Sequence, residues 1–184
     1  MQVLQNRQHD LTVACENIHD PHNVSAILRS CDAVGVAEVY LLYNQDPFPQ
    51  LGKKSSASAL KWIDIHRYRD YTKLREDLHG KGYRIYATYI GAESESIYEI
   101  DWTEPAAIVM GNEHRGVSEE MREIADRFIR IPMFGMVQSL NVSVATAVIL
   151  YEALRQRLQK GLYPAKNISE SALKSELNKW LSQK

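Results

Sequence analysis

The sequence predicts a single α/β domain built around a parallel sheet. Short apolar runs alternate with longer segments whose apolar residues recur at helical spacing, and the chain opens in the order strand, helix, strand. A βαβ opening of this kind indicates a parallel sheet. With 184 residues, 45% hydrophobic and 24% charged, the chain has the size and composition of one globular domain. We expect residues 1–163 to form this domain and residues 164–184 to form a linker and a C-terminal helix.

Strands are predicted where the apolar runs are short and bounded by turn residues. The expected strands are, in order, 11–15, 38–43, 61–65, 83–88, 106–110 and 128–131. The expected helices are 23–34, 70–79, 118–125, 139–159 and 170–181, with a linker at 163–168. Asn23 can cap the first helix and Gly35 can end it, while Gly161 and Pro164 can end the long one.

Two of these helices carry apolar stripes at helical spacing. In the first helix the expected buried stripe consists of Val24, Ile27, Leu28, Cys31 and Val34. Arg29 lies off this stripe and should project away from the core. In the long helix the expected core stripe consists of Leu140, Val144, Ala147, Val148, Tyr151, Leu154 and Leu158.

Composition excludes several classes of protein. No apolar run approaches the roughly 20 residues that span a bilayer, and residues 1–10 are polar rather than signal-like, so we expect a cytoplasmic protein without a membrane segment. Cys15 and Cys31 are too few for a disulfide framework and are expected to be buried thiols. Together with His19 and His22 they lack the paired C-x-x-C spacing of structural zinc sites, so no metal is expected.

Charge is segregated along the chain although the formal net charge is -1. Residues 53–75 include seven basic and two acidic residues, and residues 152–184 include seven and three. Residues 92–126 carry ten acidic residues against two arginines. The basic segments could contact a phosphate backbone, although solvated surfaces would show the same pattern.

The first segment with functional character is residues 17–30, which leave a strand and enter a helix. In parallel sheets, ligands gather where strands end and helices begin. Asn17 and Arg29 are therefore candidate functional residues. An Asx turn at Asn17 and a solvated Arg29 would explain the same residues structurally.

The second segment, residues 106–118, is an apolar strand followed by a glycine-bounded loop. Gly111 and Gly116 have the spacing of a P-loop, but Val117 stands where the phosphate-binding lysine belongs, and Glu113 would repel phosphates. The pattern therefore excludes a nucleoside triphosphatase. The glycines also fit a tight turn before a helix capped by Ser118.

The third segment, residues 131–143, joins a strand to the long helix through an apolar loop. Such a loop is a poor phosphate cradle but a suitable pocket wall for an adenine ring and a thioether. Free N–H groups at the helix start, with Ser139 and Asn141, could hold a polar group. The structural alternative is that Ser139 caps the helix and Asn141 satisfies another backbone group.

Together, the pattern N-x(11)-R, the sequence G-N-E, and I-P-M with S-L-N-V-S resemble the three motifs of the SpoU family in the SPOUT superfamily of methyltransferases. The resemblance runs from about residue 10 to residue 163 and extends into the C-terminal helix. Residues 32–35, 116–120, 135–143 and 155–158 are similar to the TrmH branch in particular, whose members methylate a guanosine in the tRNA D-loop. The resemblance implies 2'-O-methylation of a tRNA ribose, at guanosine 18, with S-adenosylmethionine as methyl donor.

The resemblance also implies site residues. Those carried over as catalytic are Asn17, Arg29, Glu113, Ser139 and Asn141, and those carried over as cofactor-binding are Thr88, Gly111, Ile131 and Leu140. For Arg29 the family suggests both phosphate binding and proton acceptance. Because a guanidinium stays protonated in proteins, we favour phosphate anchoring and stabilisation of the developing alkoxide.

The resemblance further implies a C-terminal trefoil knot and a homodimer in which Arg29 meets the partner's cofactor pocket. The helix expected at 170–181 could pack on its own domain or on the dimer interface. Ribosomal RNA relatives commonly carry an added N-terminal domain, and the ten residues before the first strand favour tRNA. Methylation of another tRNA or rRNA nucleotide and a non-catalytic RNA-binding dimer are the alternatives. A nicotinamide oxidoreductase has little support because the chain lacks G-x-G-x-x-G.

Overall fold

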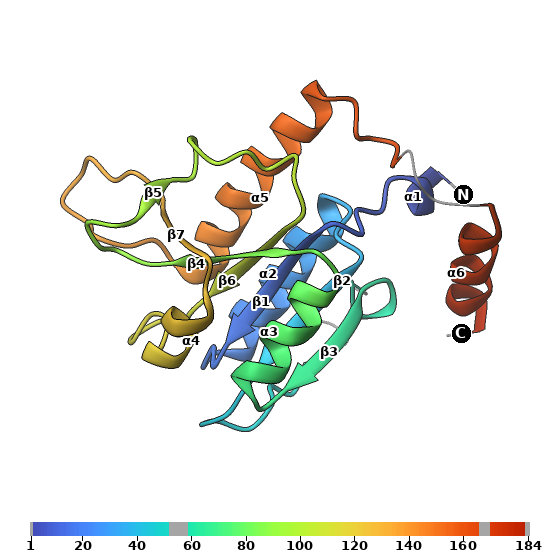
Figure 1. The fold of residues 1–184 in the computed structure, drawn as a ribbon. Helices are drawn as coiled ribbons and strands as arrows, with labels where there is room; N and C mark the ends of the chain where they lie inside the picture. Colours follow the sequence, from blue (N-terminus) through green and yellow to red (C-terminus); the bar gives the residue numbers. More distant parts are fainter. Residues whose placement is uncertain (1, 52–58, 166–169, 183–184) are drawn as a thin grey trace.

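A computed structural model describes residues 2–51, 59–165 and 170–182 of the chain (Figure 1). Its strands are β1 (Leu11–Glu16), β2 (Glu38–Leu42), β3 (Asp64–Tyr68), β4 (Arg84–Thr88), β5 (Glu95–Ser96), β6 (Ala106–Met110) and β7 (Arg127–Arg130). Its helices are α1 (Gln2–Gln5), α2 (Pro21–Ala33), the 3-10 turn η1 (Ala59–Lys61), α3 (Tyr71–Gly80), α4 (Glu119–Ile124), α5 (Val142–Gln159) and α6 (Glu170–Ser182). None of these helices is long and apolar enough to cross a membrane.

The seven strands form one parallel sheet in the order β3-β2-β1-β6-β4-β7-β5, which confirms the predicted class. β6 lies between β1 and β4, with Cys15 opposite Met110 in the register. The segments that follow β1, β4, β6 and β7 therefore meet at one edge of the sheet. The trefoil knot stays a prediction.

Helices cover both faces of the sheet (Figure 1). Alternate side chains of β1 divide between two cores: Val13 and Cys15 pack with α2 and α5, whereas Ala14 packs with α3 and α4. This alternation follows from the two-residue period of a strand. The result is three layers, with α2 against α5 on one face.

Helix α2 begins earlier than expected. Asp20, not Asn23, caps it, because the Asp20 side chain accepts the His22 N–H at 2.8 Å and Pro21 occupies the first turn. Gly35, at φ 84°, follows the end of the helix as predicted. The predicted buried stripe is confirmed, and Arg29 is exposed.

Helix α5 differs from the prediction in both its start and its core side. Asn141 caps the helix, because its Oδ1 accepts the N–H groups of Ser143 and Val144 at 2.9 and 3.4 Å. The helix therefore starts at Val142 rather than at residue 139. The predicted stripe is wrong for most of its members, because the buried side chains are those of Val142, Thr146, Ile149, Leu150, Glu152, Ala153 and Arg157. Of the predicted stripe, Val148 and Leu154 are partly buried against the core.

Strand β3 starts three residues later than the predicted strand at 61–65. The backbone N–H groups of Trp62 and Ile63 bond to the Ala59 carbonyl at 2.9 and 3.1 Å, which forms a turn rather than a strand. The short elements α1 and β5 were not predicted, because four and two residues are too few to show a period.

The C-terminal helix contacts the N-terminal part of its own chain. The rings of Trp180 and Trp62 lie 4.9 Å apart between centroids, and the Arg7 guanidinium lies 5.2 Å from the Trp180 ring. At the start of the predicted linker, the Tyr163 hydroxyl donates to the Val34 carbonyl at 2.6 Å. Residues 166–168 of that linker, and Lys53 and Lys54 of the basic segment, lie outside the described residues.

Candidate functional site

A cavity of about 600 Å³ lies at the carboxyl edge of the sheet. It is formed by the segments after β4, β6 and β7 and by the start of α5. Seven of the predicted site residues line it: Thr88, Gly111, Glu113, Ile131, Ser139, Leu140 and Asn141. A volume of this size suits a small organic ligand.

The loop after β6 is folded back on itself. The backbone groups of Asn112 and Gly116 exchange two hydrogen bonds, of 3.0 and 2.9 Å, and Gly116 has a φ of 69°. A Cβ atom at Gly111 would lie 2.3 Å from the carbonyl carbon of Gly116. Gly111 therefore permits a close backbone approach that any side chain would prevent.

Glu113 joins this loop to the start of α2. Its carboxylate accepts the backbone N–H groups of His19 and Asp20, at 2.8 and 3.2 Å, and the Asn23 amide at 2.8 Å. Burial acts to raise the pKa of Glu113, but these hydrogen bonds outweigh it and the pKa is lowered. The side chain is an ionised acceptor whose two oxygens are already engaged.

Asn23 is a site residue that the sequence pattern indicated only as a helix cap. Its Nδ2 donates to Glu113, and its Oδ1 accepts the Asn141 amide at 3.1 Å. One side chain thus links all three motif segments. Asp20 followed by Pro21 was the stronger cap signal, and it would have left Asn23 available for another role.

Ser139 and Leu140 lie in the loop just before α5. Ser139 is exposed, and Leu140 is 36% exposed and lines the cavity with Ile131. Because Asn141 caps the helix instead, the Ser139 hydroxyl is not used as a cap. Thr88, at the end of β4, also lines the cavity, and its hydroxyl donates to the Val109 carbonyl at 3.0 Å.

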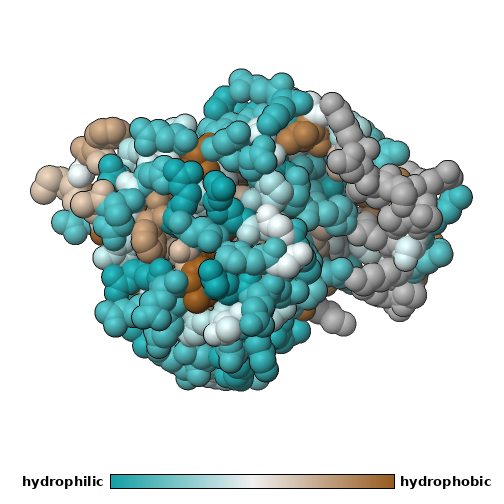
Figure 2. Space-filling view, viewed as in Figure 1, coloured by the Kyte–Doolittle hydropathy of each residue, from teal (hydrophilic) through white to brown (hydrophobic). Residues whose placement is uncertain are grey.

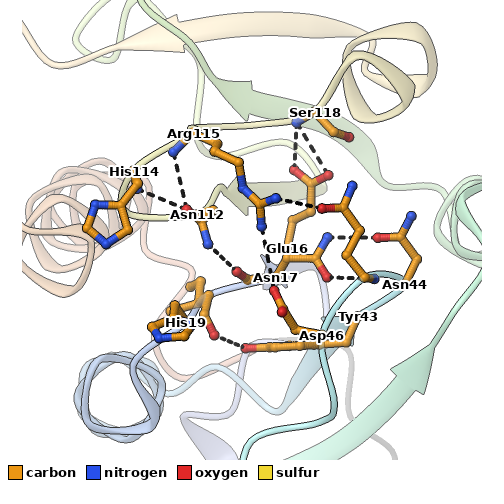
Figure 3. Close-up of polar contacts among 12 residues, drawn as sticks. Glu16, Asn17, His19, Tyr43, Asn44, Asp46, Asn112, His114, Arg115 and Ser118 are labelled. Atoms are coloured by element: carbon orange, nitrogen blue, oxygen red, sulfur yellow. Dashed lines mark hydrogen bonds and ion pairs between the residues drawn. The ribbon is translucent and has the colours of Figure 1, made fainter.

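Asn17 is close to the site but does not line the cavity. It is 4% exposed and has a φ of 45°, and its Nδ2 donates to Asn44 at 2.8 Å. Its backbone carbonyl accepts the Asn112 amide at 2.7 Å (Figure 3). The structure therefore gives Asn17 contacts that join the loops after β1, β2 and β6.

Other side chains in Figure 3 hold the same loops together. Arg115 donates to Gln45 at 2.8 Å and lies 3.6 Å from Asp46. Glu16, which is 2% exposed, accepts the Ser118 N–H at 3.1 Å. The loop after β6 is thus anchored to its neighbours at both ends.

Arg29 lies outside the cavity of its own chain. It is exposed on α2, and its guanidinium makes no hydrogen bond or ion pair with the described residues. The structure of one chain therefore does not bring Arg29 together with Glu113, Ser139 and Asn141.

The part of the chain that the structure describes contains no group of three or more His, Cys, Asp or Glu side chains placed to hold a metal ion. Cys15 and Cys31 are both fully buried, as expected. Burial, followed by the charge of Glu113, raises the pKa of the Cys15 thiol to about 12. Its thiol therefore stays protonated at neutral pH.

The chain is similar to known proteins along almost its whole length. The profile of the SpoU rRNA Methylase family matches residues 10–151. A tRNA (guanosine(18)-2'-O)-methyltransferase of Thermus thermophilus is 46% identical over 180 residues, covering 98% of this chain and 92% of the relative. The crystal structure of the Aquifex aeolicus TrmH/SpoU tRNA modifying enzyme matches with a TM-score of 0.92 and 42% identity, covering 99% of this chain and 92% of that one.

A second solved structure holds a ligand. The SpoU methyltransferase AviRb of Streptomyces viridochromogenes, in complex with the cofactor AdoMet (S-adenosylmethionine), matches with a TM-score of 0.73 and 25% identity. The match covers 84% of this chain and 62% of that one.

Proposed function

This chain belongs to the SpoU rRNA methylase family, and from that premise we propose that it transfers the methyl group of S-adenosylmethionine to the 2'-hydroxyl of guanosine 18 in tRNA. The proposed substrate rests on the similarity to the Thermus relative, which is named for this activity and matches 98% of the chain. The cavity, which gathers seven of the predicted site residues, supports the same activity.

The lining of the cavity fits S-adenosylmethionine, because apolar and polar groups lie on the same walls. Met110, Met133 and Leu140 offer apolar surface for an adenine ring and a thioether. Thr88, Gly111, Ile131 and Leu140 are the residues that would hold it. When bound there, S-adenosylmethionine supplies an electrophilic methyl group.

The remaining chemistry falls to the residues of the chain. Methyl transfer to a hydroxyl requires an in-line arrangement and the removal of one proton. Glu113 is poorly suited to take that proton, since its pKa is lowered and both oxygens already accept N–H groups. In our proposal Glu113, Asn23 and Asn141 hold the loops in place, and Ser139 contacts the substrate from the loop before α5.

The proposal includes a homodimer, as the family implies, with Arg29 acting in the cavity of the partner subunit. Support comes from the exposed side of α5, where Val144, Tyr151 and Leu158 are 49%, 55% and 55% exposed. These residues follow one another at seven-residue spacing and so share a face. An exposed apolar stripe of this kind is typical of a protein interface. Arg29, exposed and unpaired among the described residues, is available to bind a phosphate of the RNA.

The activity is tested with labelled S-adenosylmethionine and unmodified tRNA transcript, followed by mapping of the methylated nucleoside. A matched transcript with 2'-deoxyguanosine at position 18 lacks only the accepting hydroxyl. We expect one methyl group on the first transcript and none on the second. Equal labelling of both transcripts would show that the methyl group goes to another nucleotide of the tRNA. Labelling of ribosomal RNA alone would show that tRNA is not the substrate. The absence of transfer to any RNA, with RNA binding retained, would indicate a non-catalytic dimer.

The role of Arg29 in the partner's cavity is tested by mixing two inactive variants, Arg29→Ala and Asn141→Ala, and allowing subunits to exchange. A mixed dimer then contains one intact cavity that faces one intact Arg29, so activity should return. If Arg29 acts in its own cavity, neither site of the mixed dimer is complete and activity stays absent. Sedimentation of each variant alone checks that the dimer persists.

A further inference from the structure

The loop between β7 and α5 carries an apolar tip that nothing in the described chain covers. Phe134 and Met136 are each 98% exposed, and Val137 is 62% exposed. The loop protrudes at the left of Figure 1, and apolar surface projects at the same side in Figure 2. Exposed apolar groups gathered at one place indicate contact with another molecule.

The residues on either side of the tip line the cavity. Met133, just before it, and Gln138, just after it, both line the cavity, and so does Arg130 at the end of β7. Arg130 is exposed, with one long contact of 3.5 Å to the Gly91 carbonyl. Proteins that bind unpaired nucleobases combine exposed aromatic rings with arginine side chains, and the segment from Arg130 to Phe134 carries both.

We infer that Phe134 forms the stacking surface for the guanine base of the nucleotide that is methylated. This inference rests on the proposed function. The accepting hydroxyl must enter the cavity, and its base is attached to the same ribose, so the base lies just outside the cavity. Phe134 directly follows Met133, which lines the cavity. Reaching a nucleotide inside a folded RNA requires unstacking it, which costs free energy. Stacking on an exposed ring offsets that cost.

Phe134 is better suited to this role than Tyr89, which lines the cavity. The Tyr89 ring already packs against Phe128, at 5.5 Å between centroids, and the Arg122 guanidinium lies 5.2 Å from it. Phe134 makes no ring contact with the described residues. The test below distinguishes the base from two other occupants of the tip, a second copy of the chain and the adenine of the cofactor.

The test combines a protein variant with a base deletion. Wild-type protein and Phe134→Ala are titrated, with S-adenosylhomocysteine present, with tRNA transcripts that carry either guanosine or an abasic ribose at position 18. Stacking is worth about 1–3 kcal/mol per base, so we expect Phe134→Ala to bind the guanosine transcript about 5- to 150-fold more weakly. With the abasic transcript the two proteins should bind equally, because the partner of the ring is gone.

Three controls separate the other occupants. Tyr98, an aromatic residue that is 59% exposed and does not line the cavity, gives the matched variant Tyr98→Ala, which should bind like wild type. Phe134→Trp should bind the guanosine transcript at least as tightly as wild type, whereas Phe134→Leu should resemble Ala. An equal loss with both transcripts, a wild-type affinity of Phe134→Leu, a changed sedimentation coefficient, or a weakened cofactor affinity would each overturn the inference. Methylation of guanosine 18 by wild-type protein is measured separately, so a failure of the proposed function is recognised on its own.

Discussion

Replacing Gly111 by alanine is the substitution whose effect follows most directly from the structure. The added Cβ would lie 2.3 Å from the carbonyl carbon of Gly116 and 2.4 Å from the nitrogen of Val117, where ordinary contact begins at 3.4 Å. The overlap is thus about 1 Å, and it involves backbone atoms that cannot rotate away. Overpacking costs about 1–3 kcal/mol, and we expect the upper end of that range here.

The expected loss of about 3 kcal/mol corresponds to a fall in Tm of about 6–12 °C for a chain of this size. Relief of the overlap also requires the pair between Asn112 and Gly116 to open, which moves Glu113 away from the start of α2. We therefore expect the affinity for S-adenosylmethionine to fall about 10-fold or more, since the displaced loop forms one wall of the cavity.

Gly135→Ala is the matched control, because Gly135 lies in the loop beside the same cavity and its added Cβ would meet nothing within 4 Å. Thermal melts give the stability of both variants, and calorimetry gives their cofactor affinity. The control should match wild type in both measurements. If Gly111→Ala also matched wild type in both, the close approach at Gly111 would not be what shapes the cavity.

Four further predictions use the same protein. Arg29→Ala should keep its Tm while the rate of single-turnover methylation falls about 100-fold or more. Measurable activity in Arg29→Lys would indicate that Arg29 anchors a phosphate. Near-normal turnover by Arg29→Ala would show that Arg29 is not part of the site. Asn23→Ala should slow methylation with little loss of RNA affinity, because it breaks the link between the loop after β6 and α5; unchanged kinetics would show that the link is not needed. Burial raises the pKa of Glu38, but hydrogen bonds from His66 and Lys81 outweigh it and hold the pKa at about 2, below the ordinary 4.5. The ionised Glu38 carboxylate therefore stabilises the fold above pH 4.5, and this stabilisation is lost as the pH falls towards 2. The difference in Tm between wild type and Glu38→Gln should shrink to nothing over that range of pH. A difference that stays constant would contradict the lowered pKa of Glu38. The affinity for RNA should fall steeply as the salt concentration rises, because basic residues that bind phosphates release counterions from the RNA. An affinity that stays the same between low and moderate salt would argue against contact with phosphates.

Helix α5 shows where sequence patterns stop being informative. The helix is apolar on more than one side, so the period alone cannot select the side that packs on the sheet. The structure buries Ile149, Leu150 and Ala153 and leaves Val144 and Tyr151 exposed. The predicted stripe mixed two sides of the helix: Val148 and Leu154 are partly buried against the core. Val144, Tyr151 and Leu158 are exposed in one chain, on the side that we assign to the dimer interface.

Local patterns along the sequence were sufficient to predict the parallel α/β class and the buried stripe of α2, and the resemblance to the SpoU motifs supplied seven of the residues that line the cavity. Apolar periodicity and motif spacing are properties of neighbouring residues, and they survive in the fold because each segment keeps its own strand or helix. The tertiary structure alone decided which side chains meet across segments. Asn23 and Asn141 are separated by 118 positions and meet through a hydrogen bond, while Asn17 turns towards Asn44 and away from the cavity. Such contacts depend on β6 lying between β1 and β4, an order of strands that no local pattern encodes.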